Sequence, residues 1–70
     1  EMTKQELPQR KGDTVTVGVL TVKKHKPGVY SANVVGLGRN RWGTASEILE
    51  DVVYFEATGT LPLSKGAHWQ

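Results

Sequence analysis

Residues 13–24 combine β-branched side chains with an alternation of apolar and polar positions, which indicates a β-strand with one buried face. The apolar positions are odd-numbered before Gly18 and include even-numbered ones after it, as in Val15, Val17, Leu20 and Val22. A flat strand cannot move its apolar residues to the other face, so we expect a bulge or sharp bend at Gly18 that lets a small sheet curl. The alternative is a central strand that is apolar on both faces.

A hairpin is predicted at residues 24–28, which end in Pro-Gly. Proline fixes φ and glycine tolerates a positive φ, and the two central positions of a type II turn require this combination. The return strand spans residues 29–35, where apolar and polar positions again alternate. Residues 36–40 form the next turn and lead to a short third strand around Arg41 and Trp42.

Residues 44–58 favour a helix. Thr44 and Glu47 have the spacing of a capping box, and further acidic residues follow near the positive end of the helix dipole. The apolar residues form one stripe at helical spacing, and Gly59 stands where a helix would stop. In the alternative, residues 45–51 form a short helical turn and the strand-prone residues after them continue as a strand through residue 58.

The two ends of the chain have fewer signals. Residues 1–12 are polar and contain Pro8, so we expect a flexible N-terminal arm, followed by a single small domain over residues 13–70. Residues 61–63 are predicted to form an edge strand or a packed tail. The proline at their centre lacks the backbone N–H donor that a central strand needs. Residues 64–70 have loop composition, but we expect Trp69 to pack onto the domain.

These elements predict an α+β fold, a small bent antiparallel sheet of three to four strands packed by one helix. The helix would cover the sheet with one apolar stripe, with Ile48, Leu49, Val52 and Phe55 against Val17, Val22, Tyr30 and Val34. The alternative is an all-β small barrel, SH3-like or OB-like, in which the late segment is a strand.

Composition narrows the possible chemistry. The chain has 70 residues, no cysteine and two histidines, His25 and His68, so we expect no disulfide, no metal and no cofactor. Neither histidine lies in a nucleophile motif. Gly36-Leu37-Gly38 begins like a dinucleotide fingerprint, but Arg41 occupies the place of the third glycine. We therefore expect a domain without enzymatic activity.

The sequence contains neither an apolar run of roughly 20 residues nor the apolar core of a signal peptide. We expect no membrane partner and a cytoplasmic or virion-associated protein that is not secreted. Because Glu1 stands before Met2, we expect an excised domain or a tagged protein; if it is an excised domain, its function belongs to a larger polypeptide.

Charge is distributed unevenly, since residues 1–41 hold eight Lys or Arg and three acids, whereas residues 42–70 hold one and four. This asymmetry favours an anionic partner, above all nucleic acid. The candidate contact residues lie on the hairpin tip and the next turn: Lys23, Lys24, His25, Lys26, Arg39, Arg41 and Trp42. If both turns lie at one end or face of the sheet, the basic groups converge to neutralise phosphates, and Trp42 or Tyr30 stacks on a base. Alternatively, the turns are solvated and the aromatic residues belong to the core.

Part of the pattern resembles a known arrangement. A strand with Tyr30-Ser31-Ala32, a turn, a strand with Arg41-Trp42 and then Gly43-Thr44 at the start of a helix is similar to the three-stranded sheet plus helix of integrase arm-binding domains. The resemblance covers less than half of the chain and includes no diagnostic motif. The first strand lacks the polar, arginine-rich character of a sheet that enters a major groove, so we assign no family.

Two functions fit the sequence. The first is a small non-catalytic nucleic-acid-binding module that uses basic hairpin loops for phosphate contacts, with DNA favoured over RNA. The second is a structural or adaptor domain that joins a protein assembly, such as a viral particle or a homo-oligomer, through a sheet edge or apolar surface.

Overall fold

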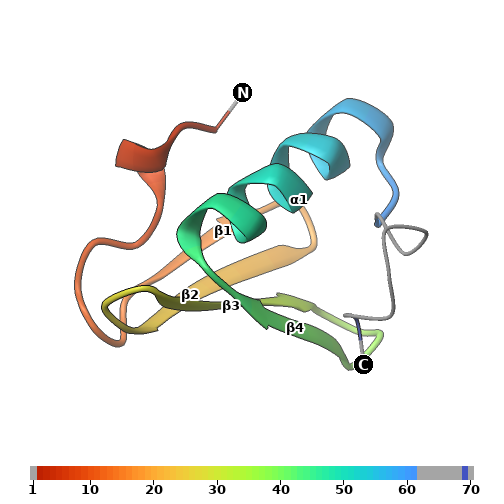
Figure 1. Cartoon of the computed structure of the whole chain (residues 1–70). Coiled ribbons are helices and arrows are strands. Elements are labelled where there is room, and N and C mark those ends of the chain that lie inside the picture. The colour runs from red at the N-terminus through yellow and green to blue at the C-terminus, as the bar shows by residue number, and fades with distance from the viewer. Residues whose placement is uncertain (1, 62–68, 70) are drawn as a thin grey trace.

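The computed structural model describes residues 2–61 and residue 69, and shows a four-stranded antiparallel sheet with one helix packed on one face (Figure 1). The strands are adjacent in chain order: β1 Thr14–Val17, β2 Leu20–Lys26, β3 Val29–Val34 and β4 Arg39–Gly43. The helix α1, Ala45–Thr58, follows β4, and a short 3₁₀ helix, η1 Lys4–Glu6, precedes the sheet. The predicted α+β fold is confirmed, and the sheet is open rather than closed into the alternative barrel.

The expected bend at Gly18 within one strand is wrong, because Gly18 belongs to a tight turn between two paired strands. β1 ends at Val17, β2 begins at Leu20, and these two residues lie opposite each other. The φ of Gly18 is 59°, and a positive φ at the first central residue alone is the pattern of a type II′ turn. A two-residue turn puts Val17 and Leu20 on the same face, which explains the change from odd to even apolar positions. The predicted single strand over residues 13–24 is therefore two strands.

The predicted hairpin between β2 and β3 is present. Pro27 and Gly28 connect the two strands, and Gly28 has a φ of 79°, the sign that a type II turn requires at its second central residue. The register shifts between Lys24 and Lys26, so His25 is the extra residue of a β-bulge. A bulge changes where a side chain points, and this one determines the position of His25.

Helix α1 begins and ends where the sequence predicts. The backbone N–H of Glu47 donates to Thr44 Oγ1 at 3.3 Å, and the N–H of Thr44 donates to Glu47 Oε1 at 2.9 Å. At the other end, Gly59 adopts the left-handed conformation and its N–H donates to the carbonyl of Phe55 at 2.7 Å. A Cβ at Gly43 would lie 3.1 Å from Glu47 Oε1, so the close passage from β4 into α1 favours a residue without a side chain there.

The core lies between α1 and the face of the sheet that α1 covers. Its central side chains are fully buried, namely those of Leu20, Val22, Ala32, Ile48 and Val52. Tyr30 and Val34 are also buried, and Val17, Leu49 and Phe55 are half-buried against this cluster. The residues of the predicted helix stripe and Val17, Val22, Tyr30 and Val34 thus lie in one hydrophobic cluster, as expected.

The described part of the N-terminal segment, residues 2–12, contributes to this core. Met2 and Leu7 are buried in it, and the backbone N–H of Met2 donates to Glu56 Oε1 of α1 at 3.0 Å. We expected a flexible arm here. The flexibility stays a prediction, but the two large apolar side chains of the segment pack with the domain.

The chain after α1 is described in part. Trp69 is buried in the same core, which confirms that it packs on the domain. Leu61 is half-buried against the core. Residues 62–63 of the expected edge strand and residues 64–68 and 70 of the expected loop lie outside the described residues.

The N-terminal cap of α1 generates a stability prediction. Thr44→Ala removes the side-chain acceptor for the N–H of Glu47, and we expect the free energy of unfolding to fall by about 1 kcal/mol. The measurement is urea unfolding followed by circular dichroism. Ser46→Ala is the matched control in the exposed first turn and should change stability by less than about 0.5 kcal/mol. Equal effects of the two variants would contradict the role given to Thr44.

Candidate functional site

The sheet and the helix carry opposite charges. The strand residues include five cations and no Asp or Glu: Lys23, Lys24, Lys26, Arg39 and Arg41. The helix includes four acids and no Lys or Arg: Glu47, Glu50, Asp51 and Glu56. The charges of the strands and of the helix therefore differ between the two layers, whereas Lys4, Arg10 and Lys11 precede the sheet.

The sheet face away from α1 includes two rows of residues that run across all four strands. The strand register gives the first row as Thr14, Lys23, Ser31 and Trp42, and the second as Thr16, Thr21, Asn33 and Asn40. We call these eight residues, together with His25 and with Lys26 next to the β2–β3 turn, the outer face. In the second row, Asn33 Nδ2 donates to Asn40 Oδ1 at 2.7 Å, and the hydroxyls of Thr16 and Thr21 are hydrogen-bonded at 3.4 Å. The outer face is thus polar and basic, and it contains no carboxylate.

His25 and Trp42 form a stacked pair on the outer face. Their ring centroids are 3.9 Å apart and the ring planes differ by 24°. The two residues come from β2 and β4, and they meet above Ser31 of the intervening β3. His25 Nε2 and Ser31 Oγ are hydrogen-bonded at 2.7 Å. Ser31 is 8% exposed although it points away from α1, because a serine side chain is small enough for the ring pair to cover it.

The three lysines of β2 have different surroundings. Lys23 and Lys26 are exposed, the first in the same row as Trp42 and the second beside the Pro27 turn. Lys24 is half-buried, and its Nζ donates to the backbone carbonyl of Gln9 at 3.0 Å and lies 5.7 Å from the centre of the Tyr30 ring. Lys23 and Lys26 are therefore the two lysines of this strand that face solvent.

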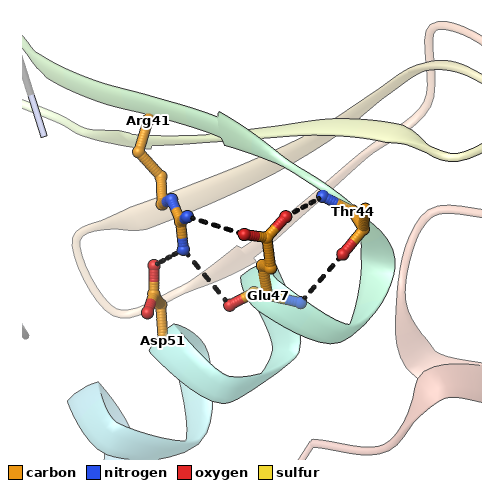
Figure 2. Close-up of polar contacts among 4 residues, drawn as sticks. All are labelled: Arg41, Thr44, Glu47 and Asp51. Atoms are coloured by element: carbon orange, nitrogen blue, oxygen red, sulfur yellow. Dashed lines mark hydrogen bonds and ion pairs between the residues drawn. The ribbon is translucent and has the colours of Figure 1, made fainter. Parts of the chain in front are cut away.

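Arg41 points to the other side of the sheet and holds α1. Figure 2 shows its guanidinium between two carboxylates of the helix: Nη1 lies 2.6 Å from Asp51 Oδ2, and Nη2 lies 3.4 Å from Glu47 Oε2. Arg41 and Asp51 are 6% and 4% exposed. A buried cation that is already paired cannot reach a phosphate on the surface, so Arg41 serves the fold.

Arg39 is exposed but lies at the opposite end of the sheet from the β2–β3 turn. Arg39 pairs with Val34 at one end of β3, and Lys26 pairs with Val29 at the other, which separates them by about 16 Å. The two predicted basic turns thus do not converge, because antiparallel pairing sends them to opposite ends.

The structure therefore brings together Lys23, His25, Lys26 and Trp42, and separates Arg39 and Arg41 from them. The sequence does not predict the role of Ser31, whose hydroxyl is hydrogen-bonded to His25 of the ring pair, because the bulge at His25 has no signal in the sequence. Sequence reasoning also missed Asp51 as the partner of Arg41. An acid within the apolar stripe of a helix is a signal for such a partner, because a buried carboxylate needs a cation or hydrogen-bond donors.

The described residues contain no group of three or more histidines and acids placed to hold a metal ion. Within the same residues, no helix is long and apolar enough to span a membrane. Comparison of the chain with protein-family models, with curated proteins and with solved structures gave no match.

The pairing of Arg41 with Asp51 generates a stability prediction. Asp51→Ala leaves a buried guanidinium without its closest carboxylate, and we expect unfolding in urea to show a loss of about 3–5 kcal/mol. The double variant Arg41→Met/Asp51→Leu should recover most of this loss. It removes both charges and also the buried Arg41 Nε, which has no hydrogen-bond partner among the described residues. If Asp51→Ala lowers the free energy of unfolding by less than about 1 kcal/mol, the ion pair contributes little to stability.

Proposed function

We propose that this domain binds nucleic acid, without catalysing a reaction, through the outer face of its sheet at the end next to the β2–β3 turn. The observation that carries the proposal is a face with exposed Lys23 and Lys26, the His25–Trp42 pair and no carboxylate. DNA is the favoured ligand and RNA the alternative.

The electrostatics support phosphate contacts at this place. A lysine that meets a phosphate displaces condensed counterions, and this release is the main source of sequence-independent affinity. The hydroxyl and amide side chains of the outer face can donate further hydrogen bonds to phosphate oxygens. The acids of α1 lie in the other layer, so the charge distribution would orient an approaching polyanion towards the sheet.

A second candidate function is an adaptor domain, and a different surface favours it. Val19, Val35 and Leu37 are 49%, 63% and 67% exposed in the turns at the far end of the sheet. The backbone N–H of Val35 donates to the carbonyl of Val19 at 3.0 Å, which brings the two turns together. Exposed apolar side chains that gather in one place are typical of protein contacts.

The salt dependence of binding tests the first function. Fluorescence anisotropy with a labelled duplex should show affinity falling roughly 10- to 40-fold between about 50 and 200 mM salt for two or three phosphate contacts. Lys23→Glu should weaken binding and reduce the slope of log affinity against log salt by about 1. Lys4→Glu makes the same change of charge in η1 and should leave the slope nearly unchanged.

Equal effects of Lys23→Glu and Lys4→Glu would show that net charge rather than the outer face determines binding. Absence of binding to duplex and to single strands at low salt would reject the first function. If, in addition, sedimentation shows a discrete oligomer that Leu37→Lys dissociates, the adaptor function is supported instead.

A further inference from the structure

Trp42 is an exposed tryptophan in otherwise polar surroundings. It retains 59% of its accessible surface, whereas Trp69 retains 7% in the core. Its neighbours in the strand register are Ser31 in its own row and Asn40 in the adjoining row. Exposed indole surface costs free energy that burial would recover, so a tryptophan in this position suggests a contact with a partner.

The orientation of the indole is set before any ligand arrives. His25 stacks on one face at a centroid distance of 3.9 Å, and the hydrogen bond to Ser31 holds the imidazole in place. The bulge in β2 and the small side chain on β3 create this contact. A ring held in one orientation loses little conformational entropy on binding, which favours affinity.

The stacked pair leaves one face of Trp42 for a further ring. His25 occupies one face of the indole, and the exposed fraction of the residue shows that the other face is accessible. A nucleic-acid base has the flat π-surface that extends such a stack, and any of the bases can do so. Lys23 lies in the same row two strands away, about 10 Å between backbones, so its long side chain can contact the phosphate chain of the same ligand.

We infer that Trp42 is a stacking platform for an unpaired base, and that the ligand of the outer face is therefore single-stranded nucleic acid. The inference rests on the proposed function and narrows its ligand. In a duplex the faces of the bases are already stacked on each other, and moving one onto Trp42 would require unstacking and unpairing. A single strand offers the same phosphates together with free base faces.

The test compares single strands of about 10 nucleotides, as DNA and as RNA, with the matching duplex. Wild-type protein should bind the single strands at least about tenfold more tightly than the duplex. Trp42→Ala should weaken single-strand binding by about 10- to 100-fold and change duplex binding by less than about threefold. Trp42→Phe keeps an aromatic ring and should retain most of the affinity.

Tryptophan fluorescence gives a second readout that does not depend on a folded alanine variant. A base stacked on the indole should quench the emission of wild-type protein. The quenching should disappear in Trp42→Phe, where Trp69 is the remaining tryptophan. Circular dichroism would confirm that both variants are folded.

The outcomes separate the inference from the proposed function. Equal affinity for duplex and single strands, with no effect of Trp42→Ala and no quenching, would overturn the stacking role but leave phosphate binding by the outer face intact. Failure to bind any of the nucleic acids at low salt would overturn both. Tighter binding to DNA or to RNA would identify which single strand supplies the base.

Discussion

The ion pair between Arg41 of β4 and Asp51 of α1 is the contact on which the arrangement of the two layers depends. It is buried, and its partners belong to the last strand and to the helix that follows it. The carboxylate of Glu47 joins the same structure, since one oxygen accepts from the N–H of Thr44 and the other lies near Arg41. One group of side chains thus starts the helix and attaches it to the sheet. Because separating these charges would leave them buried and unpaired, the helix has one preferred position on the sheet.

This contact also explains the charge of the outer face. Arg41 points towards α1 and is paired there with Glu47 and Asp51. The acids of the helix therefore lie in the layer opposite the outer face. Alternation along β4 then places Trp42, the next residue, on the opposite face. The inward arginine and the outward tryptophan are two consequences of one strand register. The fold and the candidate site are therefore linked at adjacent residues.

Local signals in the sequence were sufficient for several elements. The capping box of Thr44 and Glu47, the stop at Gly59 and the Pro27-Gly28 turn act within a few residues, so their interpretation does not need the rest of the fold. Gly18 was misinterpreted because a bend and a two-residue turn both account for a change of apolar phase. The choice between a bend and a turn depends on whether residues 20–24 pair with residues 13–17. Such pairing is a property of the whole sheet.

The candidate site was harder to predict for the same reason. Lysines 23 and 26 were identified from charge alone, but the position of Arg39 and Arg41 depends on the direction and register of β4. The contact between His25 and Trp42 spans three strands and requires a bulge at one specific residue. Charge in a sequence indicates the class of partner. The face that a charge occupies depends on strand pairing.

The most direct test of the account is an NMR titration of the labelled domain with a single-stranded oligonucleotide. The largest shift changes should fall on Lys23, His25, Lys26 and the indole N–H of Trp42, and residues 45–58 of α1 should change little. Changes concentrated on α1, or on the turns that hold Val19, Val35 and Leu37, would contradict binding by the outer face.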